Sequence, residues 1–275
     1  MTYREFWQPL TARYDEGEAK AITRMVAEVR YGLTHADVLA GRMETVEEQQ
    51  LQQLQQRLLA DEPVQYVLGE AQFLGRWFHV EPGVLIPRPE TEELVQHVLA
   101  CTQPTSWQGT ILDIGTGSGC IPIYLAKKLP DCLFSAIDIS DDALGTARSN
   151  AERHGCIINF IKADILDYQT SAMFDIIVSN PPYVLESEKA FMQPNVLDYE
   201  PDTALFVPDD DPLKFYRAIC KFAVEHLNDG GKLYFEINEK YGQETAELMR
   251  FCGFGEVKVM QDLFGKDRFA IGQKA

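Results

Sequence analysis

The chain has 275 residues, of which 45% are hydrophobic, and its 42 acidic and 25 basic residues leave a formal net charge of -17. This length suits about two domains, and the hydrophobic content is sufficient for packed cores. Proteins hold nucleic acid mainly through clustered Lys and Arg. The longest basic cluster here is Lys127-Lys128, so the composition argues against a direct nucleic-acid substrate.

Residues Met1–Leu10 lack the basic and apolar regions of a secretory signal, and no apolar run approaches the roughly 18 residues of a membrane span. The six cysteines include no Cys-x-x-Cys pair, which favours buried small side chains over a disulfide framework or a metal site. We therefore expect a cytoplasmic monomer with no membrane contact and no metal.

Residues 1–67 are predicted to form a small helical bundle. Apolar residues recur at helical spacing from Ile22 to Val29 and again from Leu51 to Leu58. The segment Thr45–Glu48 has the sequence of a capping box, which predicts that the second of these helices starts there. No catalytic constellation occurs in this part, so we expect it to serve packing or contact with a partner.

Residues 68–88 are predicted to form a β-hairpin linker, because aromatic and aliphatic residues alternate on both sides of Leu74-Gly75-Arg76. The following segment, Ile86–Glu92, has two prolines and then the acidic first turn of a helix. Arg88 in this segment, and Glu236 much later, are candidates for supporting roles only.

From Gly109 onward strand and helix patterns alternate, as a parallel α/β sheet requires. Strands are predicted at 110–114, 133–138, 158–163, 174–179, 232–237, 256–260 and 268–271. Helices are predicted at 121–128, 142–154, 213–226 and 243–252. Residues 89–275 should therefore form a Rossmann-like domain with a seven-stranded sheet.

The first of these strands ends in a loop whose glycines are spaced Gly-x-Gly-x-Gly, at Gly115, Gly117 and Gly119. Glycines in this place let the backbone approach a ligand at the carboxyl edge of the sheet. A dinucleotide site prefers Gly or Ala where this chain has Cys120, which weakens the case for NAD.

Two acidic residues follow the next two strands. Asp138 ends the second strand, where a carboxylate can accept both hydroxyls of a ribose, and Asp164 follows the third. Carboxyl ends of parallel strands share one edge, so a nucleoside held there would lie beside Asn180. Each acid alone is more often a turn former or a helix cap, whereas the ordered set favours a nucleoside site.

The fourth strand ends in Ser-Asn-Pro-Pro-Tyr, and the two prolines make the chain leave the sheet rigidly. The Asn180 side-chain oxygen and the Pro181 carbonyl are then placed to accept the two N–H groups of a planar amide or aromatic amine. Tyr183 is expected to stack on that planar group. This arrangement suits methylation of a conjugated nitrogen without a general base.

The chain resembles the HemK/PrmC family of protein-(glutamine-N5) methyltransferases over most of its length. The resemblance rests on Ile86–Glu92, Asp113–Gly119, Asn180–Tyr183, Tyr199–Leu205 and Asp262–Arg268. It implies S-adenosylmethionine as the methyl donor and S-adenosylhomocysteine as the product. It also implies an acceptor, the glutamine of the Gly-Gly-Gln loop in class I peptide chain release factors.

Carried over by motif, the resemblance implies that residues 1–67 bind the release factor and that residues 89–275 are the methyltransferase domain. The implied donor-binding residues are Gly115, Thr116, Gly117, Ser118, Gly119, Asp138, Asp164, Ile165 and Asn180. The implied acceptor-binding residues are Asn180, Pro181, Pro182 and Tyr183, and of these Asn180, Pro181 and Tyr183 are the expected catalytic set.

Two segments depart from the family pattern. Phe206-Val207-Pro208 and three aspartates stand where relatives usually have a glycine-rich turn, so the conformation there is not predicted. Gly272-Gln273 replaces the usual terminal Gly-Arg. Two other functions stay open, namely an adenine-N6 methyltransferase acting on nucleic acid and a donor-binding module without catalysis.

Overall fold

The computed structural model describes residues 1–102 and 107–275, and the chain divides into two compact units. The first unit consists of Met1–Ala71, Val80–Pro82 and Met192–Tyr199, and the second of Gln72–His79, Gly83–Phe191 and Glu200–Ala275. Within the described residues, no helix is long and apolar enough to cross a membrane.

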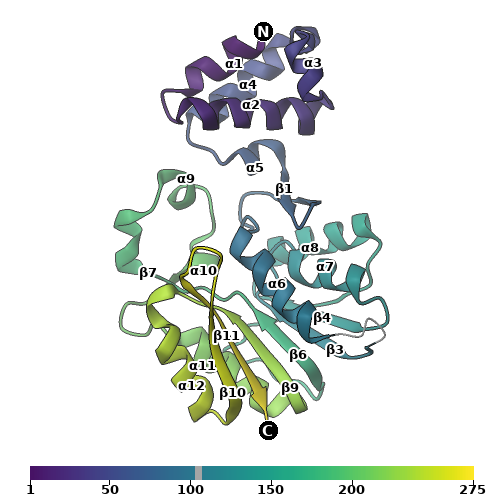
Figure 1. Ribbon diagram of the computed structural model, residues 1–275, viewed down its shortest axis with the longest axis vertical. Coiled ribbons are helices and arrows are strands. Elements are labelled where there is room, and N and C mark those ends of the chain that lie inside the picture. Colours follow the sequence, from purple (N-terminus) through teal and green to yellow (C-terminus); the bar gives the residue numbers. More distant parts are fainter. Residues whose placement is uncertain (103–106) are drawn as a thin grey trace. The chain divides into compact units, whose positions relative to one another are not determined.

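The first unit is built from short helices (Figure 1). These are α1 (Tyr3–Leu10), α2 (Glu16–Tyr31), α3 (His35–Leu39), the 3-10 turn η1 (Arg42–Thr45), α4 (Glu48–Leu59), α5 (Val64–Leu68) and α9 (Pro194–Leu197). Phe6, Met43 and Leu58 are fully buried in its core. Tyr199, which follows α9, donates its hydroxyl to the Ala60 carbonyl at 2.8 Å.

The first residues of the helices in this unit differ from the sequence prediction at one place, the start of α4. α1 begins with a capping box at Thr2, and α3 begins with one at Thr34. The capping box predicted at Thr45–Glu48 is wrong, because Thr45 ends η1 and donates its hydroxyl to the Arg42 carbonyl at 2.7 Å. Glu48 is consequently the first residue of α4 rather than the third.

The predicted hairpin is present as β1 (Glu70–Phe73) and β2 (Arg76–His79). Its two-residue turn has positive φ at both positions, 47° at Leu74 and 73° at Gly75. This turn matches the twist of the strands that it joins. The rings of Phe73 and Phe78 meet edge to face at 6.0 Å.

The second unit confirms the Rossmann-like fold and its seven strands. The sheet has the order β10-β11-β9-β6-β3-β4-β5. The five strands from β9 to β5 are parallel, and β11 alone runs antiparallel to the others, between β9 and β10. The strands are β3 (Thr110–Ile114), β4 (Leu133–Asp138), β5 (Asn159–Lys162), β6 (Phe174–Ser179), β9 (Leu227–Glu236), β10 (Phe254–Gln261) and β11 (Asp267–Lys274).

Helices cover both faces of this sheet (Figure 1). One core joins the sheet to α6 (Pro89–Cys101), α7 (Cys120–Lys128) and α8 (Asp141–His154), and the other joins it to α11 (Lys214–His226) and α12 (Gly242–Phe251). Successive strand residues serve opposite cores, as with Ile176 and Ile177. The strands are apolar on both faces for this reason, as buried parallel strands are.

The connection after β6 contains four short elements in this unit, and the 3-10 turn η3 (Glu239–Tyr241) follows β9. The four elements are β7 (Val184–Leu185), η2 (Glu186–Phe191), α10 (Asp202–Leu205) and β8 (Phe206–Val207). β8 pairs in parallel with β7, so the segment that departs from the family pattern is ordered beside the end of the Asn-Pro-Pro-Tyr string.

Candidate active site

A cavity of about 390 Å³ opens at the carboxyl ends of the parallel strands, entirely within the second unit. It brings together the ends of β3, β4, β5 and β6, as the strand order requires. Of the residues predicted from the sequence, its lining contains Gly115, Thr116, Gly117, Ser118, Asp138, Asp164, Ile165, Asn180, Pro181 and Pro182. Gly119 and Tyr183 are the two predicted residues outside the lining.

The glycine loop after β3 has left-handed backbone at Gly115, Gly117 and Gly119, with φ of 77°, 53° and 77°. Gly119 precedes α7, and a Cβ on it would lie 3.0 Å from Ile123 and 3.1 Å from Ala147. Glycine is therefore required there for the close approach of α7 and α8. This packing role differs from the donor contact that the motif implies.

Asp138 joins this loop to the end of β4. Its Oδ2 accepts the backbone N–H of Gly117 at 2.9 Å, and its Oδ1 accepts that of Ser140 at 3.0 Å. A carboxylate has about four acceptor positions, so about two are left for a ligand. Burial raises the pKa of Asp138, and the backbone hydrogen bonds oppose that rise.

Asp164 and Ile165 lie together at the end of β5. The Asp164 carboxylate accepts the backbone N–H of Leu166 at 2.9 Å, which shapes the turn, while Ile165 and Leu166 also line the cavity. The segment thus combines an acceptor with an apolar wall, which suits the amino edge and the flat face of an adenine ring.

Three buried polar side chains make no hydrogen bond of good geometry among the described residues. They are Asp113 in β3 and Thr116 and Ser118 in the loop that follows. Burial raises the pKa of Asp113 to about 7; the nearby Thr116 hydroxyl opposes that rise, and the charge of Asp138 adds to it. Thr116 and Ser118 line the cavity, whereas Asp113 is fully buried and does not line it. The two hydroxyls are thus available to a polar ligand, and the nearby acid suits one with positive charge such as S-adenosylmethionine, which has a sulfonium and an ammonium group.

Asn180 follows β6 and is held by α6. Its Nδ2 donates to Thr91 Oγ1 at 3.1 Å, and Thr91 donates to Glu236 Oε2 at 2.7 Å. The Oδ1 of Asn180 and the Pro181 carbonyl have no hydrogen-bond partner in the part of the chain that the structure describes. Two oxygen acceptors are therefore available on residues that line the cavity.

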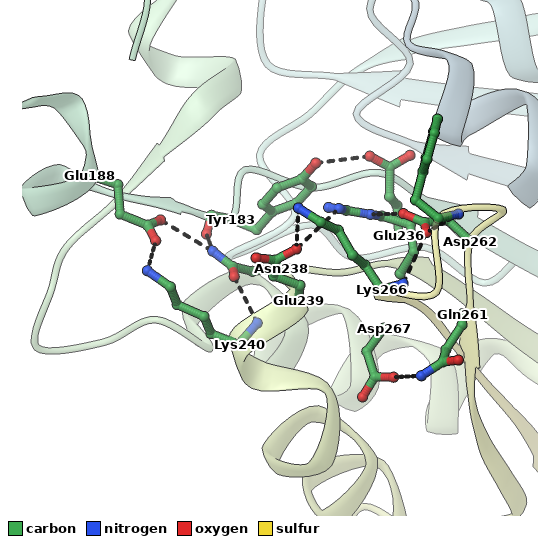
Figure 2. A network of polar contacts seen from close by, with 12 residues as sticks. Tyr183, Glu188, Glu236, Asn238, Glu239, Lys240, Gln261, Asp262, Lys266 and Asp267 are labelled. Atoms are coloured by element: carbon green, nitrogen blue, oxygen red, sulfur yellow. Dashed lines mark hydrogen bonds and ion pairs between the residues drawn. The ribbon is translucent and has the colours of Figure 1, made fainter. Parts of the chain in front are cut away.

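Tyr183 points to the end of β9 (Figure 2). Its hydroxyl donates to Glu236 Oε1 at 3.0 Å, and its carbonyl accepts from Asn238 Nδ2 at 3.1 Å. Burial raises the pKa of Glu236, and the hydroxyls of Thr91 and Tyr183 oppose that rise. The Tyr183 side chain is hydrogen-bonded to the end of β9 and does not line the cavity. Its expected stacking on the acceptor amide stays a prediction.

Sequence reasoning missed much of the wall formed by the segments before α6 and around α10. Arg88 donates to both carboxylate oxygens of Glu200 at 2.7 Å, and Ile86 donates its backbone N–H to the same carboxylate at 3.3 Å. The Glu200 side chain is only 1% exposed. Both residues lie in segments that the resemblance singled out, 86–92 and 199–205. Neither segment by itself indicates that Arg88 and Glu200 form an ion pair.

Among the described residues, no group of three or more His, Cys, Asp or Glu side chains is arranged to hold a metal ion. The free thiols of Cys120 and Cys220 are buried, and burial raises the pKa of the Cys120 thiol to about 12. Neither is therefore a candidate nucleophile.

The doubly covered sheet, the glycine loop and the Asn-Pro-Pro segment on one cavity define a Rossmann-like methyltransferase. Residues 91–196 match the family model of the methyltransferase small domain, and residues 4–69 match that of the PrmC N-terminal domain. A solved methyltransferase from Pyrococcus furiosus has the same fold, with a TM-score of 0.55 and 21% identity over 80% of this chain and 98% of that one.

Two curated relatives narrow the class. The release factor glutamine methyltransferase of Bacteroides thetaiotaomicron is 46% identical over 97% of this chain and 97% of its own length. That of Flavobacterium psychrophilum is 43% identical over 96% of this chain and 95% of its own length. The chain belongs to the family of release factor glutamine methyltransferases.

Proposed function

We propose that this protein transfers the methyl group of S-adenosylmethionine to the side-chain amide nitrogen of the glutamine in the Gly-Gly-Gln motif of class I release factors. The proposal rests on one observation. Two acceptor oxygens without a partner among the described residues, Asn180 Oδ1 and the Pro181 carbonyl, belong to residues that line a cavity, and this cavity is also lined by residues suited to bind a nucleoside. Family membership agrees with it.

Donor binding is assigned to the loops after β3, β4 and β5. Residues Gly115–Ser118, Asp138, Asp164 and Ile165 line the cavity. The backbone of the first segment would pass close to the donor, Asp138 would accept its ribose hydroxyls, and Asp164 with Ile165 would hold its base. When bound, S-adenosylmethionine supplies an electrophilic methyl group attached to a sulfonium.

Acceptor activation is assigned to Asn180 and Pro181. The lone pair of an amide nitrogen is conjugated, and rotation about that bond costs about 18 to 20 kcal/mol. Two oxygens that accept the two N–H groups favour the geometry in which the lone pair faces the methyl carbon, and they stabilise positive charge on nitrogen. Pro182 supports this turn by fixing its backbone φ.

The helical first unit is proposed to bind the body of the release factor. It contains no catalytic constellation, and a tethered partner raises the local concentration of its own flexible Gly-Gly-Gln loop at the cavity. We propose a cytoplasmic monomer that does not act on nucleic acid, and the net charge of -17 supports the last point.

The test supplies radiolabelled S-adenosylmethionine and the intact protein with a class I release factor, its loop Gln→Ala variant, DNA or RNA. We expect label on the unaltered release factor alone. Label on adenine of DNA or RNA would support the adenine-N6 reading instead, and equal labelling of the loop variant would show that the acceptor residue is a different one. Light scattering of the purified protein tests the monomer.

A further inference from the structure

The side chain of Asn180 belongs to a chain of hydrogen bonds that crosses three elements. Thr91 lies in the first turn of α6, Asn180 after β6 and Glu236 at the end of β9. Thr91 is 3% exposed and Glu236 is fully buried. The chain of bonds runs from Asn180 Nδ2 to Thr91 Oγ1 and from there to Glu236 Oε2.

The direction of these bonds follows from counting protons. With Glu236 ionised, its carboxylate only accepts, so it takes the single hydroxyl proton of Thr91 on one oxygen and that of Tyr183 on the other. Thr91 then has no proton left for Asn180 and offers it only a lone pair. The group that Asn180 turns toward Thr91 must therefore be its NH2.

The opposite orientation of the Asn180 amide would place its oxygen against the lone pairs of Thr91. Thr91 could then bond Asn180 only by withdrawing its proton from Glu236, which would leave a buried carboxylate short of a donor. Tyr183 cannot replace that donor, because it already occupies the other oxygen. With Glu236 ionised, the arrangement permits one orientation, in which Oδ1 has no hydrogen-bond partner among the described residues and belongs to a residue that lines the cavity.

We propose that Thr91 and Glu236 are positioning residues that hold the Asn180 amide with its oxygen toward the acceptor nitrogen. This inference rests on the proposed function for the identity of the acceptor, but the orientation itself depends only on the hydrogen bonds. Asn has two nearly isosteric ends, and only the oxygen end can accept an N–H group. Without an orienting partner, the amide would present its NH2 to the substrate for part of the time.

Other charged groups near Glu236 do not replace these bonds. Glu90 in α6 and Arg268 in β11 act on its carboxylate through their charges. Arg268 donates from Nε to Asp262 Oδ2 at 3.3 Å and lies 3.8 Å from Glu239. Figure 2 shows Lys266 bound to the same Glu239. The hydroxyls of Thr91 and Tyr183 are thus the donors assigned to Glu236.

The first measurement is single-turnover transfer to the release factor by Thr91→Val, Thr91→Ser and Thr245→Val. Thr91→Val removes the hydroxyl at nearly constant shape, and we expect the transfer rate to fall about 10- to 100-fold. Thr91→Ser keeps the hydroxyl and should retain most of the rate. Thr245 in α12 is buried with an unpartnered hydroxyl, so Thr245→Val is the matched control and should match wild type.

Calorimetric titration with S-adenosylmethionine distinguishes a loss of Asn180 orientation from a general disruption of the cavity. The dissociation constant for Thr91→Val should change little while its transfer rate falls. A parallel loss of donor affinity and melting temperature would overturn the positioning role, because it would mean that the cavity itself had collapsed. Equal rates in Thr91→Ser and Thr91→Val would overturn it too, since the hydroxyl would then be irrelevant.

The second measurement needs no acceptor. The side-chain NH2 signals of Asn180 can be identified in a ¹⁵N–¹H spectrum by their loss in Asn180→Asp. We expect slow hydrogen exchange of these signals in wild type and Thr91→Ser, and faster exchange in Thr91→Val. Unchanged exchange in Thr91→Val would overturn the proposal, whereas a wild-type protein that does not label release factor would overturn only the proposed function.

Discussion

Asp138 offers the sharpest test of the donor site. Its two carboxylate oxygens already accept backbone N–H groups from Gly117 at 2.9 Å and Ser140 at 3.0 Å. The two acceptor positions that remain match the two adjacent hydroxyls of a ribose. Asp138→Ala removes both sets of bonds, and Asp138→Asn keeps the shape but directs an NH2 at one of the two N–H donors.

The magnitude follows from those bonds. A hydrogen bond to a charged group contributes about 1.5 to 3 kcal/mol, and about 1.4 kcal/mol corresponds to a tenfold change in dissociation constant. A net loss equal to one such bond, about 1.5 to 3 kcal/mol, predicts that Asp138→Ala raises the dissociation constant of S-adenosylmethionine about 10- to 100-fold. Asp138→Asn should give a rise in the same direction.

Isothermal titration calorimetry with S-adenosylmethionine measures this directly. Asp131→Asn is the matched control, because it removes one exposed negative charge from the turn before β4 and should leave affinity unchanged. Unchanged affinity in Asp138→Ala would refute the assignment of ribose binding to this residue. An equal loss in the control would mean that general electrostatics, rather than hydrogen bonding, holds the donor.

Three further predictions follow from the same site. Asn180→Ala should slow single-turnover methyl transfer about 100- to 1000-fold, since one preorganised partner of the developing charge is lost, and a wild-type rate in the folded variant would exclude the acceptor role of this side chain. Asp113 holds its proton up to a pKa of about 7 in the folded chain against 3.8 normally, so the folded state binds more protons between these values and the free energy of unfolding falls as pH rises through them. Asp113→Asn should therefore raise the melting temperature more at pH 8 than at pH 5, at about 2 to 4 °C per kcal/mol relieved, and a pH-independent difference in calorimetry would contradict this. Arg88→Ala leaves the Glu200 carboxylate buried without its partner and should lower the free energy of unfolding in urea by about 2 to 3 kcal/mol, somewhat below the cost for a fully buried pair because Arg88 is 30% exposed; Lys162→Ala, which breaks an exposed pair with Asp141, should cost less than about 1 kcal/mol.

Local patterns in the sequence determined the seven strands of the main sheet and the helices that cover it, but not the short elements after β6. Apolar runs of five or six residues, each closed by a glycine, an acid or a proline, predicted β3, β4 and β6 with the bounds that the structure has. These strands are buried on both faces, so their composition differs from that of the helices between them. The rule that parallel strands share a carboxyl edge then placed Asp138 and Asn180 on one cavity.

Short-range signals were less reliable where two local structures compete for one side chain. Thr45 and Glu48 have the spacing of a capping box, yet the Thr45 hydroxyl serves the preceding 3-10 turn. Both uses satisfy a backbone group within a few residues, and the identity of the residues does not distinguish them. The surrounding fold of the first unit decides between them.

Tertiary structure alone decided which polar side chains meet around the site. Thr91 and Glu236 are 145 positions apart in the chain, and Arg88 and Glu200 are 112 apart. The sequence around each of these residues predicts only a helix turn, a strand end or a loop. Hydrophobic periodicity predicts which face of an element is buried. It does not predict the hydrogen-bond partner of a buried polar group, because that partner comes close only when the whole sheet has formed.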